Sequence, residues 1–186
     1  QKTFGQLFNL GRDFALDGSQ FDKLIDDGET LMCGDIALSA FATPGHTSDS
    51  ISLQAGDAIF IGDTLFSPQY GTARCDFPGG SAVDLYRSVS RLMKEPDETR
   101  LYLCHDYPVA GEQPVAFSTV KQQKKNIHVG EGVSEAEFIA LRKQRDAELD
   151  LPRLLLPAIQ VNIRAGNWPD PEDNGTRYLK IPINKM

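Results

Sequence analysis

The stretch TPGHT, residues 43–47, follows an alternating run of apolar and small residues that extends from Ile36 to Thr43. An alternation with a period of two is typical of a β-strand that buries one face. Pro44 fixes the backbone where this strand ends, and Gly45 permits a tight turn directly before His46. The pattern therefore predicts a strand whose end projects an imidazole from the edge of a sheet.

Two further strand ends are predicted to carry side chains of the same kind. The stretch FIGDT ends an apolar run with Asp63, and the stretch LYLCHDY ends another with His105. Side chains at strand ends can converge although they are far apart in sequence, and rigid strands hold them as accurately as a metal demands. One such histidine alone is more often an ordinary hydrogen-bonded residue. Three junctions together favour a metal site made by His46, Asp63 and His105.

The ligand types in this set narrow the choice of metal. Imidazole and carboxylate suit zinc and iron. Two histidines and one carboxylate also form the facial arrangement of non-haem Fe(II) oxygenases, which leaves coordination positions open for O₂ and a substrate. Both metals remain open from these residues alone.

The order of predicted elements gives an α/β fold class, with helices and sheet in layers (α+β in layers). Residues 1–186 are expected to form a single domain. Ser81 and Ser134 are candidate helix N-caps, because an acidic residue follows each of them three positions later. Strands are expected at 30–33, 36–43, 50–54, 58–61 and 100–104, and helices at about 1–10, 81–94, 118–126 and 134–149.

Composition excludes several classes of partner. The net charge of −7 would repel a polyanion, so we expect no nucleic acid. No apolar run approaches the roughly 20 residues of a membrane helix, so we expect no membrane. The chain shows no signal peptide, and its three cysteines lack the Cys-x-x-Cys spacing of a zinc site, so a reducing cytoplasm fits best. Cys33 is expected in the core, and Cys104 is expected to be structural.

Taken in order, TPGHT at 43–47, GDTLF at 62–66 and CHDY at 104–107 resemble the second half of the metallo-β-lactamase superfamily signature. They resemble in particular its glyoxalase II and persulfide dioxygenase branch. The resemblance covers essentially the whole chain and implies the C-terminal part of the αββα sandwich. The family's first signature, His-x-His-x-Asp-His, is absent. The resemblance therefore implies an incomplete fold that lacks its N-terminal portion, with uncovered strand edges and apolar faces.

Two details of the resemblance favour the persulfide dioxygenases. RCDF at residues 74–77 matches their Arg-x-Asp-Phe metal loop, and HDY at 105–107 differs from the usual glyoxalase II pattern. The implied function is iron-dependent dioxygenation of a low-molecular-weight persulfide to sulfite and thiol, a step of sulfur metabolism. One Fe(II) would be held by His46, Asp63 and a histidine of the absent segment. His105 would lie next to these ligands without binding the iron itself. Asp63 and Tyr107 are the expected catalytic residues, and Tyr107 would face the substrate.

The resemblance also implies a substrate side. Residues 157–166, PAIQVNIRAG, are similar to a stretch that lines the family's pocket, which gives Asn162 and Arg164 substrate-binding roles. The glutathione-binding relatives carry an arginine on the helix after His-Asp-Tyr, where this chain has KKNIH at 124–128. Without that arginine, Lys124, Lys125 or His128 is expected to receive a substrate carboxylate, and a solvated helix face is the alternative for the two lysines. The carrier is glutathione or another small thiol. Arg74 and Asp76 are expected to pair and brace the metal loop.

Two alternative functions remain open. A glyoxalase II-like thioester hydrolase, of the hydroxyacylglutathione hydrolase type, would place Asp63 between two metals such as zinc, with His105 on the second. The other alternative is an inactive fragment that serves as a binding or scaffold piece. The family resemblance is also compatible with a homodimer.

Overall fold

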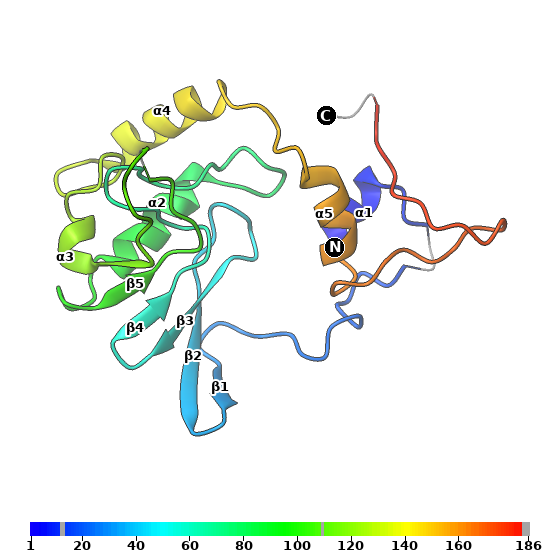
Figure 1. Cartoon of the computed structure of the whole chain (residues 1–186), viewed down its shortest axis with the longest axis horizontal. Helices are drawn as coiled ribbons and strands as arrows, with labels where there is room; N and C mark the ends of the chain where they lie inside the picture. Colours follow the sequence, from blue (N-terminus) through cyan, green and yellow to red (C-terminus); the bar gives the residue numbers. More distant parts are fainter. Residues whose placement is uncertain (12–13, 109, 184–186) are drawn as a thin grey trace. The chain divides into compact units, whose positions relative to one another are not determined.

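The computed structural model describes residues 1–11, 14–108 and 110–183. They divide into two compact units (Figure 1), which we call the terminal unit, Gln1–Leu24 with Asp150–Met186, and the central unit, Ile25–Leu149. The expectation of one domain over residues 1–186 stays a prediction.

The central unit is built on a six-stranded sheet whose strands lie in chain order. All neighbours pair antiparallel except the fourth and fifth strands, which run parallel. A parallel pair needs a long crossover connection, and here the crossover contains a helix. The predicted mixed α/β class is confirmed. The strands are β1 (Thr30–Cys33), β2 (Ile36–Ala42), β3 (Ile51–Ala55), β4 (Ala58–Phe60), β5 (Arg100–Tyr102) and β6 (Phe117–Thr119).

Three helices belong to the central unit: α2 (Ala82–Leu92), α3 (Val120–Gln123) and α4 (Glu135–Asp146). Ser81 caps α2 and Ser134 caps α4, because each side chain accepts a hydrogen bond from the backbone N–H of the residue three positions later. The predicted helix over 118–126 is wrong in extent. Residues 117–119 pair with β5 as a sixth strand, and only then does the chain enter a helix.

Helices cover one face of the sheet. Ile59 and Leu101 are fully buried on this face and join the same core as Leu85 and Val89 of α2. Side chains alternate along a strand, so their neighbours point to the opposite face. There the rings of Phe60, Tyr102 and Phe117 form a row across β4, β5 and β6. Tyr102 stacks on Phe60, with ring centroids 5.0 Å apart, and is tilted against Phe117, with centroids 5.3 Å apart.

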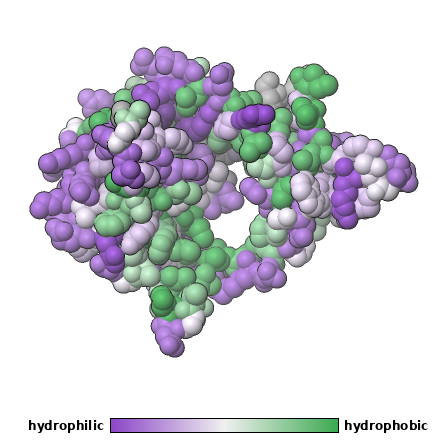
Figure 2. Space-filling view, in the orientation of Figure 1, coloured by the Kyte–Doolittle hydropathy of each residue, from purple (hydrophilic) through white to green (hydrophobic). Residues whose placement is uncertain are grey.

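This aromatic row is partly open to solvent. Phe60 is 46% exposed and Phe117 is 43% exposed. Met32 and Ile36, on the first two strands, are also exposed. Figure 2 shows hydrophobic residues gathered over the strands at the lower part of the view. The expectation of uncovered apolar faces therefore holds for the described residues.

The terminal unit contains α1 (Lys2–Leu7) and α5 (Leu155–Asn162). Gln1 links the two ends of the chain within this unit, since its Nε2 donates to the carbonyl of Ile163 at 2.9 Å. In the described part of the chain, no helix combines the length and the apolar character needed to cross a membrane.

Candidate metal centre

Three predicted site residues meet at one corner of the central unit. His46, Asp63 and His105 each lie a few residues beyond a strand, namely β2, β4 and β5. Nε2 of His46 lies 4.0 Å from Oδ2 of Asp63, and Nε2 of His105 lies 3.0 Å from Oδ1. The carboxylate thus presents one oxygen to each imidazole. We propose that this corner holds a metal ion.

The chemistry of Asp63 fits a cation at this corner. Its Oδ1 is shut off from solvent and has no hydrogen-bond partner among the described residues, although His105 is at ion-pair distance. A buried acceptor without a donor costs about 1–3 kcal/mol. Asp63, Cys104 and His105 each offer one ligand atom, and these atoms lie within 4.8 Å of one another. A metal ion would satisfy the carboxylate and use all three groups.

The place of Cys104 beside Asp63 and His105 was not predicted from the sequence. Cys104 was expected to be structural, yet it is exposed, and its sulfur lies within 4.8 Å of the ligand atoms that Asp63 and His105 offer. Its position directly before His105 was the available signal. Cys33 was expected in the core, which is wrong, because β1 is an edge strand and leaves it exposed. Cys75 is buried, and burial together with the Asp146 carboxylate raises the pKa of its thiol to about 12.

The turn before His46 is anchored on α2. The Ser81 N–H donates to the carbonyl of Gly45 at 2.8 Å, and the Ser88 hydroxyl donates to the carbonyl of Pro44 at 2.7 Å. Gly45 has a φ of +147°, and a Cβ there would lie 2.4 Å from the Cα of Leu85. Only glycine permits this close approach, so the sequence fixes where the turn presents the imidazole.

A backbone hydrogen bond sets the tautomer of His46. Its Nδ1 lies 2.8 Å from the carbonyl oxygen of Arg74. A carbonyl oxygen only accepts, so Nδ1 carries a proton, and Nε2 is the ring nitrogen that faces Asp63. The Phe77 ring packs edge-on against the imidazole at 5.4 Å. Metal-binding histidines are usually held in this way by a hydrogen bond on the second nitrogen.

The RCDF loop is braced as predicted. The Arg74 guanidinium donates to both oxygens of Asp76, at 2.7 and 2.6 Å, and lies 4.6 Å from the centre of the Phe77 ring. The hydrogen bond from Arg74 lowers the pKa of Asp76, so the carboxylate stays ionised. The predicted pairing is confirmed, and it stiffens the loop that orients His46.

Tyr107 lies in an aromatic cluster beside the corner. Its ring stacks on Tyr70 at 4.9 Å and meets Phe66 edge-on at 5.3 Å, with His105 at 6.0 Å. Partial burial and the Asp63 carboxylate raise the pKa of Tyr107, so its hydroxyl stays protonated at neutral pH. The hydroxyl is therefore able to donate a hydrogen bond, and its contact with a substrate stays a prediction.

His128 does not lie where a substrate-binding residue was expected. It is only 4% exposed, and its Nδ1 accepts the backbone N–H of Thr72 at 3.0 Å. Burial, with the nearby charge of Arg142 and Arg145, lowers its pKa to about 4. A neutral, enclosed imidazole does not fit the role of receiving a carboxylate, and His128 instead supports the loop after Gly71.

Asn162 and Arg164 belong to the terminal unit. Asn162 is exposed at the end of α5. Arg164 donates to the carbonyl of Gln160 at 2.6 Å and lies 4.9 Å from the centre of the Phe14 ring. Their substrate-binding roles stay predictions.

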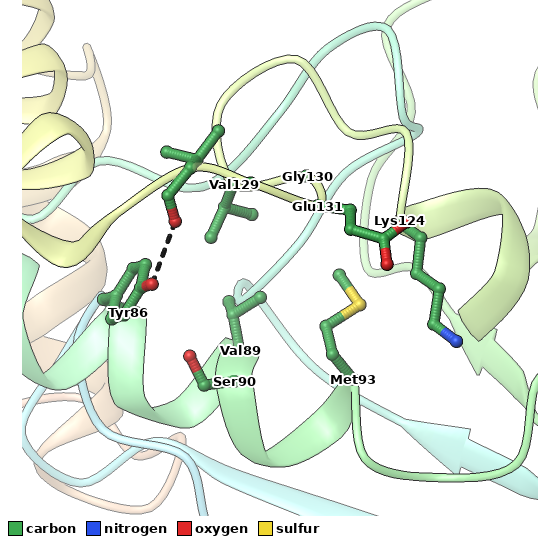
Figure 3. Close-up of a pocket in the computed structure, with 10 residues that line it drawn as sticks. Tyr86, Val89, Ser90, Met93, Lys124, Val129, Gly130 and Glu131 are labelled. Carbon is green, nitrogen blue, oxygen red and sulfur yellow. Dashed lines mark hydrogen bonds between the residues drawn. The ribbon is translucent and has the colours of Figure 1, made fainter.

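A pocket of about 270 Å³ opens elsewhere in the central unit, between α2 and residues 124–133. Figure 3 shows Tyr86 and Val89 of α2, with Met93 directly after the helix, along one side. The Tyr86 hydroxyl donates to the carbonyl of Val133 at 2.9 Å. Lys124, one of the three candidates for receiving a substrate carboxylate, lines the pocket, but His46, Asp63 and His105 do not. The pocket therefore has no part in the corner around Asp63.

Comparison with known proteins places the chain in a family. Residues 3–105 match the sequence model of the metallo-beta-lactamase superfamily. The chain is 52% identical to a probable metallo-hydrolase of Burkholderia pseudomallei, with all of this chain and 67% of that protein aligned. It is 47% identical to Glyoxylase B2 of Dictyostelium discoideum, with all of this chain and 64% of that protein aligned.

Two further matches are proteins named ETHE1. The chain is 30% identical to the human mitochondrial persulfide dioxygenase ETHE1, over 81% of this chain and 57% of that protein. Among solved structures, ETHE1 from Myxococcus xanthus superposes with a TM-score of 0.68 at 36% identity, covering 77% of this chain and 60% of that one. The chain thus spans between 57% and 67% of the length of these four proteins.

Proposed function

The chain belongs to the metallo-β-lactamase superfamily, and we propose that the natural protein is an enzyme that uses one Fe(II) to oxidise a low-molecular-weight persulfide. The observation that carries the proposal is the bond from His46 to the Arg74 carbonyl, at 2.8 Å. It ties the Arg-x-Asp-Phe loop, which favours persulfide dioxygenases by resemblance, directly to the imidazole that faces Asp63. The likeness to ETHE1 from Myxococcus xanthus supports the same choice.

His46 and Asp63 would hold the iron, and a third imidazole would come from a His-x-His-x-Asp-His segment, which this sequence does not contain. When bound, ferrous iron supplies the activation of O₂ and the exchange of electrons with the substrate sulfur. The balanced reaction converts persulfide, O₂ and water to thiol, sulfite and two protons. The terminal sulfur is oxidised and leaves the carrier, and O₂ is reduced.

The residues around the corner would bind the substrate and limit its contact with water. The Tyr107 hydroxyl would donate a hydrogen bond to the persulfide or its oxidised sulfur. The aromatic rings of Phe66 and Tyr70, which pack on Tyr107, would limit the access of water. The substrate is a small thiol persulfide, and a glutathione carrier is one candidate.

A second candidate function rests on a separate observation. His46 and His105 face different oxygens of Asp63, and Cys104 lies with His105. In a two-metal hydrolase, Asp63 would help to hold both ions. Asp63, Cys104 and His105 would then hold a second ion such as zinc, and the enzyme would cleave a thioester. The names of the relatives from Burkholderia and Dictyostelium favour this candidate.

Metal counting and substrate turnover in the natural full-length protein separate the candidates. The protein is purified without oxygen, its metals are counted, and it is given glutathione persulfide or a glutathione thioester. We expect one iron per chain, with O₂ consumed in step with sulfite release. Two metals per chain with thioester cleavage would establish the hydrolase instead. No metal and no turnover would leave the inactive scaffold piece.

A further inference from the structure

A buried ion pair on α4 contacts the loop that orients His46. Arg142 and Asp146 lie one turn apart, and Nη2 of Arg142 donates to Oδ1 of Asp146 at 2.7 Å. Both side chains are more than nine-tenths buried. Removing two charges from water is costly, and hydrogen bonds to further groups must offset part of that cost.

Those further groups are backbone atoms of residues 72–75. Nη1 of Arg142 donates to the carbonyl of Thr72 at 3.0 Å. The N–H of Cys75 donates to Oδ2 of Asp146, also at 3.0 Å. The ion pair therefore fixes the backbone of this loop at two points.

One peptide group joins this ion pair to the metal centre. The N–H of Cys75 and the C=O of Arg74 belong to the same planar peptide, so they point in opposite directions. Asp146 accepts from the N–H at one end, and Nδ1 of His46 donates to the carbonyl at the other end, at 2.8 Å. Hydrogen bonds in a chain polarise one another, by about 10–30% per bond.

We propose that Asp146 is a positioning residue for the metal centre. Its carboxylate acts through the Arg74–Cys75 peptide to fix the orientation of His46 and to make its Nε2 a stronger ligand. In many metal sites a carboxylate bonds directly to the ligand histidine. Here a peptide stands between the two, and Arg142 holds the carboxylate in place. The inference rests on the proposed function in taking His46 as a ligand.

The test is Asp146→Asn in the natural full-length protein, which removes the charge of the side chain and keeps its shape. Metal affinity, measured by competition with a chelator, is expected to fall by about 10–100-fold, the usual loss when a group that orients a ligand is changed. The Nδ1–H signal of His46, assigned by its loss in His46→Gln, is expected to move upfield in the NMR spectrum of metal-free protein. This second readout does not need a metal, so it tests the inference even if the proposed function fails.

A control on the same helix separates positioning from stability. Phe138 of α4 is fully buried and packs on Tyr86. Phe138→Leu should lower the Tm while leaving the His46 signal and the metal affinity at wild-type values. The inference is overturned if Asp146→Asn leaves both readouts unchanged, or if Phe138→Leu reproduces both changes.

A double variant covers the case in which Asp146→Asn does not fold because Arg142 is left buried without its partner. Arg142→Met with Asp146→Leu removes both charges and the acceptor for the Cys75 N–H. We expect the same upfield movement and a loss of affinity of at least tenfold by the same reasoning. Wild-type readouts in this variant would overturn the inference.

Discussion

Nε2 of His105 lies 3.0 Å from Oδ1 of Asp63, yet that oxygen has no hydrogen-bond partner among the described residues. The distance is short enough for attraction, but the groups are not aligned as donor and acceptor. His46 faces the other oxygen at 4.0 Å. A carboxylate held between two imidazoles in this way is suited to a cation on either side, and the number of cations distinguishes the two proposed reactions.

The close approach of Gly45 to α2 predicts that Gly45→Ala will displace His46. A methyl group there would lie 2.4 Å from the Cα of Leu85, which is helix backbone and has little freedom to move. We expect a loss of metal content and about 1–3 kcal/mol of stability, the usual cost of overpacking. Elemental analysis and thermal unfolding measure the two effects.

Gly56→Ala is the matched control for this change. Gly56 also has a positive φ, +59°, but no atom lies within 4 Å of the added methyl group. The variant should lose about 1 kcal/mol from backbone strain and keep its metal. Equal metal content in both variants would contradict the role given to the turn.

Tyr107→Phe keeps the stacked ring and removes the hydroxyl. If that hydroxyl donates to the substrate, kcat for persulfide oxidation should fall by about 10–100-fold, because a hydrogen bond to a charged group contributes about 1.5–3 kcal/mol. Metal content should stay constant. Tyr70→Phe, in the ring stacked on Tyr107, should have a much smaller effect. An unchanged kcat in Tyr107→Phe would show that the Tyr107 hydroxyl has no catalytic role.

The buried His128 predicts a specific dependence of stability on pH. Its pKa is about 4 in the folded protein against an ordinary 6.5, so protons bind the unfolded chain more readily. Its contribution to the free energy of unfolding is complete above pH 6.5 and is lost as the pH falls toward 4. The full difference corresponds to about 3 kcal/mol.

His128→Asn should remove this dependence, since the Asn side chain offers an acceptor for the Thr72 N–H and does not titrate. Denaturant unfolding at about pH 7 and about pH 4.5 should show the wild type losing about 2–3 kcal/mol more than the variant. Parallel losses in the two proteins would show that His128 is not held neutral by burial.

The sequence predicted local features well where local chemistry decides them. The strand at Thr30–Cys33 and the caps at Ser81 and Ser134 follow from alternation and from side chains that bond nearby backbone. The turn at Gly45 also follows from residue type. This turn presents His46 toward Asp63, with 4.0 Å between Nε2 and Oδ2.

Features that depend on distant partners were not predicted. Ser118 was assigned to a helix, but pairing with β5 makes it a strand residue. The burial of His128 depends on the loop after Gly71, which lies more than 50 residues earlier in the chain. The spacing of Arg142 and Asp146 allows an ion pair on a helix, but no local pattern indicates that the pair is buried against residues 72–75.

The most direct test of the central claim is the iron content of Asp63→Ala, measured by elemental analysis of the natural full-length protein. Asp57→Ala is the control, because this exposed carboxylate lies in the turn before β4 and pairs with Arg100. We predict that the wild type and the control retain iron and that Asp63→Ala retains none. Iron content in Asp63→Ala equal to that of the wild type would contradict the assignment of the corner as a metal centre.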